Sequence, residues 1–309
     1  MGGLAILRTA SRANCRILTF HSFRKQDQRN LDLLCREMTR SFSPLPLSEI
    51  VEGLSRGKLP PNSLTVTVDD GYRSYLEFGH EIFQRHKIPV TVYAVSGFAD
   101  GRLWLWPDQV EFALQHSELT SLESQITPGV LCSLRLSDQA SRLASTSKLT
   151  EELKLVEDEV REAYLARLPA MFGVAIPPTP PPDRAAMSWN ELRAVASDGV
   201  EIGCHTDTHP ILSRVTSSSK LEQEIAGSKA ILEANLGRPV RHFCYPNGRL
   251  MDISPQSANL VRNAGFDSAM TTVPGLNAPG TDIQNLKRIS FDSYTDRHYG
   301  AELLAGLHL

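Results

Sequence analysis

Short apolar runs alternate with helix-like segments along this chain of 309 residues, and that alternation limits the possible folds most strongly. Seven runs have the length and composition of buried β-strands: 16–20, 64–68, 90–95, 200–204, 242–245, 267–271 and 286–291. Segments with apolar residues at helical spacing separate most of them, at 31–40, 47–56, 75–86, 220–236 and 257–264. Strands that alternate with helices are typical of parallel βαβ units, so we expect an α/β fold.

Residues 100–187 interrupt this alternation of strand-like and helix-like segments. The stretch opens with Trp104-Leu105-Trp106 and contains a charged segment of helical period at 151–168. A proline-rich stretch at 177–182 then predicts a stiff, extended linker. We therefore expect one domain over residues 1–309, with a helical insertion at about 100–187 instead of a second catalytic domain.

Composition and charge exclude several classes of protein. The net charge of −3 gives no basic surface that would favour nucleic acid or anionic lipid. No apolar run approaches the roughly 20 residues of a membrane span, and the first 16 residues lack the apolar core of a signal peptide. The five cysteines are scattered and odd in number, which is typical of buried, reduced thiols. These features predict a cytoplasmic protein.

Two of the strand-like runs end in side chains that bind metals. Asp69 and Asp70 follow the run 64–68, and His205 and His209 follow the run 200–204. One carboxylate with two imidazoles is a ligand set that leaves coordination positions open for water and substrate. The second carboxylate would then be free to act as a base, and the combination predicts metal-assisted hydrolysis.

Each motif alone has a simpler explanation. Adjacent aspartates before a glycine commonly form a turn, and two histidines four residues apart are commonly a pair on a helix surface. In a parallel α/β barrel, however, the loops that follow the strands meet on one rim, and catalytic groups lie there. His21 and Asn247 also follow strand-like runs. We therefore favour a site on this rim.

Three stretches resemble the conserved motifs of a known family. Thr67-Val68-Asp69-Asp70-Gly71 and His205-Thr206-Asp207-Thr208-His209 resemble the first two motifs of the polysaccharide deacetylases, the fourth family of carbohydrate esterases. Phe243-Cys244-Tyr245-Pro246-Asn247-Gly248 resembles a variant of the third motif. The family includes the nodulation chitooligosaccharide deacetylases, and the resemblance covers about residues 16–291 without the insertion. It implies a distorted (β/α)7 TIM-like barrel, which is compatible with the seven runs.

The resemblance also implies roles for individual residues. Asp70, His205 and His209 would bind a divalent metal, most often zinc, with cobalt or nickel as alternatives. Asp69 would be the base that takes a proton from the attacking water. The backbone N–H nearest Asn247 would help to hold the oxyanion of the tetrahedral intermediate. The substrate would be an N-acetylated sugar of a polysaccharide or oligosaccharide.

Two departures from the family pattern matter for the chemistry. The arginine that usually orients the base is replaced by Cys244, and the usual late histidine, a general acid, is absent near Arg288. Members of the exopolysaccharide-linked branch are similar in both respects, and they also carry a histidine after the first strand. Arg288 is therefore a candidate for orienting the base. His21 is a candidate general acid or substrate ligand, which we expect on the side of the metal opposite Asp69.

The function predicted from the sequence is removal of acetyl groups from N-acetylated sugars by a metal-dependent hydrolase. Tyr245, Arg288 and Trp106 are candidates for substrate contact, although Trp104 and Trp106 would equally serve as core residues that anchor the insertion. Two alternatives stay open. One is a metal-dependent amidase on a small molecule, similar to allantoinase, for which a closed pocket would be expected. The other is a sugar-binding relative without catalytic activity.

Overall fold

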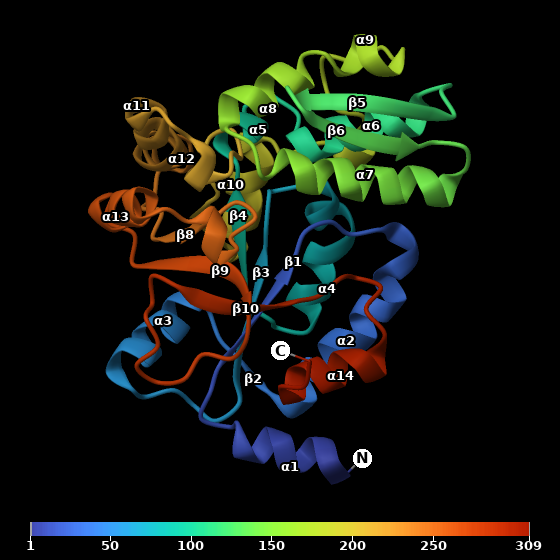
Figure 1. Cartoon of the computed structure of the whole chain (residues 1–309). Coiled ribbons are helices and arrows are strands. Elements are labelled where there is room, and N and C mark those ends of the chain that lie inside the picture. The colour runs from blue at the N-terminus through green and yellow to red at the C-terminus, as the bar shows by residue number, and fades with distance from the viewer. Residues whose placement is uncertain (1, 309) are drawn as a thin grey trace.

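A closed barrel of seven parallel strands forms the centre of the molecule (Figure 1). The computed structural model describes residues 2–308. The barrel strands are β1 (Arg16–Phe20), β3 (Ser63–Val68), β4 (Val90–Ala94), β7 (Glu201–Cys204), β8 (His242–Cys244), β9 (Ser268–Pro274) and β10 (Leu286–Ser290). They follow the order β1-β10-β9-β8-β7-β4-β3, and pairing of β1 with β3 closes the ring. The predicted (β/α)7 barrel is confirmed.

The pairing is uneven around the barrel. β1 and β3 stay in register from Arg16 opposite Leu64 to Phe20 opposite Val68. In contrast, β7 meets β8 at one pair, Cys204 with Phe243, and the register between β9 and β10 shifts. A short strand β2 (Ser43–Pro44) pairs with the start of β3, at Ser63 and Leu64. The barrel is therefore regular on the side of β1, β3 and β4 and distorted on the side of β8 to β10.

Helices surround the barrel and bury their apolar sides against it. They are α2 (Gln28–Ser41), α3 (Leu47–Arg56), α4 (His80–Arg85), α5 (Ser96–Ala99), α10 (Trp189–Ser197), α11 (Ser218–Glu222), α12 (Ser228–Leu236), α13 (Pro255–Asn263) and α14 (Arg297–Ala305), with α1 (Gly2–Ala10) at the N-terminus. In α2, for example, Leu31, Leu34, Cys35 and Met38 are buried at helical spacing. Ser188 caps the start of α10 and forms a capping box with Glu191.

The insertion packs over one end of the barrel and has its own apolar core (Figure 1). It consists of α6 (Trp106–His116), β5 (Ser121–Thr127), β6 (Val130–Arg135), α7 (Gln139–Leu153), α8 (Asp158–Leu165) and α9 (Leu168–Phe172). Two expectations need correction. The insertion contains an antiparallel hairpin, β5–β6, because buried residues such as Cys132 and Leu134 alternate with exposed ones. The helix expected at 151–168 is broken between α7 and α8.

All five cysteines are buried and free. Within residues 2–308, no helix has both the length and the apolar character needed to cross a bilayer.

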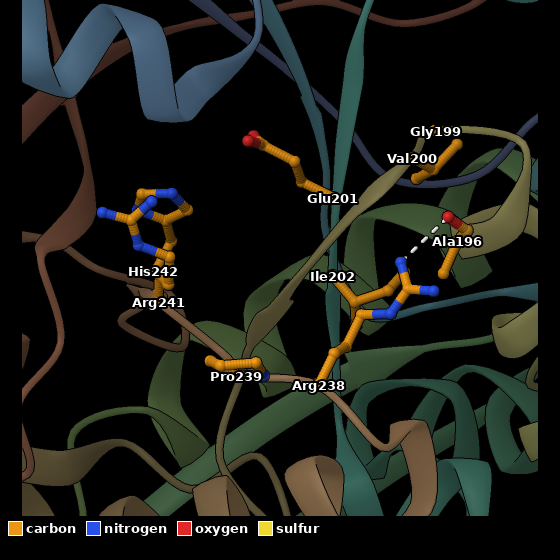
Figure 2. Close-up of a pocket in the computed structure, with 9 residues that line it drawn as sticks. All are labelled: Ala196, Gly199, Val200, Glu201, Ile202, Arg238, Pro239, Arg241 and His242. Carbon is orange, nitrogen blue, oxygen red and sulfur yellow. Dashed lines mark hydrogen bonds between the residues drawn. The ribbon is translucent and has the colours of Figure 1, made fainter.

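A small cavity of about 180 Å³ lies beside the amino ends of β7 and β8 (Figure 2). Here the Glu201 carboxylate accepts hydrogen bonds from the Thr91 hydroxyl at 3.0 Å and from the Ser48 backbone N–H. The Arg238 guanidinium donates to the Ala196 carbonyl at 3.0 Å. These contacts join strands to the helices around them. At this end of a TIM-like barrel, buried polar groups serve stability, and catalytic groups lie at the opposite end.

Candidate functional site

A cavity of about 430 Å³ opens at the carboxyl ends of the strands, beneath the insertion. Its lining combines predicted site residues with residues of the insertion and of loops. These are His21, Asp69, Asp70, Tyr72, Leu105, Trp106, Pro107, Thr150, Glu151, Lys154, His205, His209, Ile211, Asn247, Arg249 and Thr272. The loops that follow different strands therefore bring together residues that are far apart in the sequence.

Asp70, His205 and His209 form the centre of this cavity. The Nε2 atoms of His205 and His209 each lie 3.4 Å from the same oxygen, Oδ1 of Asp70. Tetrahedral zinc with bonds of about 2.0–2.1 Å needs ligand atoms about 3.4 Å apart, so this spacing fits such an ion. The His205 Nδ1–H donates to the Cys244 carbonyl at 2.7 Å, which orients the ring with its Nε2 toward Asp70. Burial lowers the pKa of His209 to about 3, so its imidazole is neutral.

Left-handed backbone conformations place these side chains. Asp70, Thr206, His209 and Asn247 have φ values of 72°, 70°, 60° and 58°. Such angles are uncommon for residues other than glycine and concentrate at functional sites. The turn at Asp70 separates its side chain from that of Asp69.

Asp69 lies in a buried ion pair with Arg288. The guanidinium donates from Nη1 to Oδ1 and from Nη2 to Oδ2, both at 2.7 Å, and both side chains are almost fully buried. Burial alone would raise the pKa of the Asp69 carboxyl, but the Arg288 charge and its hydrogen bonds hold that pKa well below its usual value. Asp69 is therefore ionised throughout the neutral range.

Cys244 lies beside this ion pair, at the position where the family pattern has its orienting arginine. The Arg288 Nη2–H donates to the Cys244 sulfur at 3.2 Å, and the thiol lies 3.5 Å from Asp69 Oδ2. Burial raises the pKa of the Cys244 thiol, so it stays protonated. The guanidinium thus reaches Asp69 from β10, next to the place from which the family's arginine would come.

A buried carboxylate also holds the loop that carries the two histidines. Glu224 accepts from the backbone N–H groups of Asp207 and Thr208, both at 2.9 Å, and from the Thr208 hydroxyl at 2.6 Å. On the other side of the loop, Trp106 Nε1–H donates to the His209 carbonyl at 3.3 Å. Glu224 carries no functional signal in the sequence, because it lies within an ordinary helix-period segment.

Three candidates lie differently from our expectation. His21 is half-exposed on the same rim, but its Nε2 lies 3.8 Å from Asp69 Oδ2, beside the aspartate and not across from it. Tyr245 is buried in the barrel core against Phe243 and does not line the cavity. Arg288 is likewise buried behind Asp69, so its position suits orientation of that carboxylate and not contact with substrate.

Comparisons with known proteins agree with this architecture. Residues 173–269, which include His205, His209 and Asn247, match the family model for polysaccharide deacetylases. A search of curated protein sequences gives no significant match.

Several solved structures share the fold at low sequence identity. The deacetylase PplD of Streptococcus pyogenes, in complex with acetate, has a TM-score of 0.58 at 14% identity over 90% of this chain and 92% of that chain. IcaB from Ammonifex degensii has a TM-score of 0.58 at 16% identity over 95% of this chain and 96% of that chain. The BpsB deacetylase domain from Bordetella bronchiseptica has a TM-score of 0.55 at 16% identity over 91% of this chain and 96% of that chain. The family match over residues 173–269 and the fold shared with these deacetylases therefore agree with the resemblance to the polysaccharide deacetylases that the sequence motifs indicate.

Proposed function

We propose that this protein is a metal-dependent deacetylase that hydrolyses the acetamido group of an N-acetylated sugar in a polysaccharide or oligosaccharide. One observation carries the proposal: Asp70, His205 and His209 converge in one cavity, beside an aspartate that Arg288 holds in its ionised form. The neighbour PplD was solved with acetate, the product of deacetylation.

The three converging side chains would hold the metal, with zinc as our first choice and cobalt or nickel as alternatives. A divalent ion there would act as a Lewis acid toward the acetyl carbonyl and would activate water for attack. A second group of possible ligands, Asp69, His205 and Cys244, lies nearby. It is a poor competitor because the Arg288 cation already contacts both Asp69 and Cys244 and would repel a metal ion.

Asp69 would accept the proton of the attacking water. Both of its oxygens are bound by Arg288, which fixes the orientation of the carboxylate and keeps it out of the metal ligand set. Its low pKa keeps it ionised, although it also makes Asp69 a weaker base than a carboxylate without such a partner. Arg288 therefore supplies the orientation that the family's missing arginine would otherwise give.

Two further groups would act on the substrate. The backbone N–H of Asn247 has no acceptor within residues 2–308, and it would donate to the developing oxyanion. His21 would protonate the departing amine or bind the sugar, since it is half-exposed on the same rim. Trp106 would contribute apolar surface for a sugar ring.

The insertion supports a second candidate function. Trp106, Thr150, Glu151 and Lys154 form part of the cavity wall, and the volume of about 430 Å³ lies at the small end of ligand pockets. A wall of this kind would also suit a small amide. Under this alternative, the same residues would hydrolyse a small molecule and would leave polymers uncut.

Acetate release decides between these functions. The purified protein is stripped with a chelator, reloaded with zinc, cobalt or nickel, and given N-acetylated glycans from single sugars to polymers, together with small cyclic and linear amides. We expect metal-dependent acetate release from the glycans. The Asp69→Asn variant should keep its metal and lose about 10²–10⁴-fold in rate, because an amide cannot accept the proton. Turnover of small amides alone, or full activity in Asp69→Asn, would contradict the proposal.

A further inference from the structure

Asp252 is a buried carboxylate behind the turn that carries Asn247. It ends the short helical turn Leu250–Asp252 after β8, and it is 1% exposed. The Asn247 side-chain amide donates to its Oδ2. Arg249 donates to the same oxygen from its backbone N–H at 3.1 Å and from Nε at 2.9 Å. One carboxylate therefore fixes both the side chain of Asn247 and the residue two positions later.

The Asn247 turn depends on this support. Asn247 and Gly248 both have left-handed backbones, with φ of 58° and 61°, and Asn247 is the residue with an intrinsic cost there. On the opposite side, Thr272 donates from its hydroxyl to the Asn247 carbonyl at 2.5 Å and from its N–H to the Gly248 carbonyl at 2.9 Å. The turn is thus held between Asp252 and Thr272.

Arg249 also joins this turn to the insertion. Its Nη1 lies 2.9 Å from Oε2 of Glu151 on α7, and the other Glu151 oxygen lies 2.7 Å from Lys154 Nζ. Arg249, Glu151 and Lys154 all line the cavity that contains the candidate metal ligands. A chain of contacts therefore runs from α7 through Arg249 and Asp252 to Asn247.

The contacts at the two ends of this series contribute differently to the stability of the fold. Glu151 and Arg249 are partly exposed, and such ion pairs contribute little to the stability of a protein. Asp252 is fully buried as a charged group, so its position is fixed by the donors around it. A role for Glu151 would therefore appear in catalysis more clearly than in folding.

We propose that Asp252 is a positioning residue for the Asn247 turn, and that the Arg249–Glu151 ion pair couples the placement of the insertion to that turn. This inference rests on the proposed function, because it assumes that the Asn247 N–H stabilises the oxyanion. The insertion would then be an integral part of the active site.

Asp252→Asn tests the first half of the proposal. The amide keeps the size of the side chain, and its oxygen can still face Asn247 and Arg249, but it carries no charge and accepts these hydrogen bonds more weakly, so the turn should shift. Losing an oxyanion donor costs about 10²–10³-fold, so displacing one should lower kcat about 10- to 100-fold with little change in KM. Metal content should equal that of the wild type. Asp267→Asn is the control for loss of an aspartate–arginine contact away from the site, since Asp267 accepts from Arg241 Nε at 2.5 Å at the amino ends of β8 and β9.

Glu151→Gln and the double variant test the coupling. We expect Glu151→Gln to lower kcat as well, by a smaller factor than Asp252→Asn. If Glu151 acts through Arg249 and Asp252, the double variant should be no slower than Asp252→Asn alone. If the fold loss of kcat in the double variant equals the product of the two single losses, the two residues act independently and the coupling is overturned.

Failure of the positioning role can be distinguished from failure of the proposed function. An unchanged kcat in Asp252→Asn, or a loss matched by lost metal or lost folded protein, would overturn the positioning role. If the wild type releases no acetate from any glycan, the proposed function fails and takes this inference with it. If only the variants behave unexpectedly, the proposed function stands.

Discussion

Replacing Arg288 with methionine tests how the fold controls Asp69. Methionine fills much of the same volume without a charge. The change removes both 2.7 Å contacts to Asp69, together with those to the Thr271 carbonyl and the Thr19 hydroxyl. Asp69 would be left 2% exposed and without its main counter-charge. Breaking a buried ion pair by removing one partner costs about 3–5 kcal/mol, a large part of the stability of a typical domain.

The pH dependence follows from the sign of the pKa change. In the wild type the folded pKa of Asp69 is depressed, so its stabilising contribution is present above about pH 3.9 and is lost as pH falls through the folded pKa. In Arg288→Met, burial dominates and raises the folded pKa of Asp69 above its unfolded value. The variant should therefore lose stability as pH rises through the neutral range. Its destabilisation should be larger at pH 7 than at pH 5.

Catalysis should change in parallel. A protonated Asp69 cannot accept a proton, so the acid limb of the kcat/KM profile should move to higher pH in Arg288→Met. Urea unfolding at pH 5 and pH 7, with acetate release across the same range, measures both effects. Arg16→Met is the matched control, because Arg16 is equally buried but donates to the Leu304 and Asn14 carbonyls and not to a carboxylate. The Arg16→Met variant should be destabilised, but the pH dependence of its kcat/KM should not shift. An unshifted profile and unchanged stability in Arg288→Met would refute the argument.

Two further predictions concern the rim. His205→Ala should lower metal content and activity together, as measured by elemental analysis and acetate release, because it removes one of the three converging ligand atoms; normal metal content would argue against the ligand set. His21→Ala should keep the metal and reduce turnover, with loss of the basic limb of the pH profile. Unchanged rate and profile would exclude His21 as the acid and assign that role to another group or to solvent.

The sequence by itself determined the architecture and the centre of the candidate site. The seven strand-like runs correspond to the seven barrel strands, because alternation between strand and helix periods is a local property. The positions of Asp69, Asp70, His205 and His209 at strand ends were likewise visible in the sequence. Parallel strands necessarily bring these ends to one rim, and the structure places the four residues in one cavity.

Only the tertiary structure decided how the site is supported. Arg288 meets Asp69 across 219 residues of sequence, and Glu151 meets Arg249 across 98. No local period records such contacts, because they depend on barrel closure and on where the insertion packs. For the same reason, the sequence did not show that Tyr245 points into the core or that His21 lies beside Asp69. Local patterns fix which residues reach the rim, whereas side-chain packing between distant segments decides which of them meet.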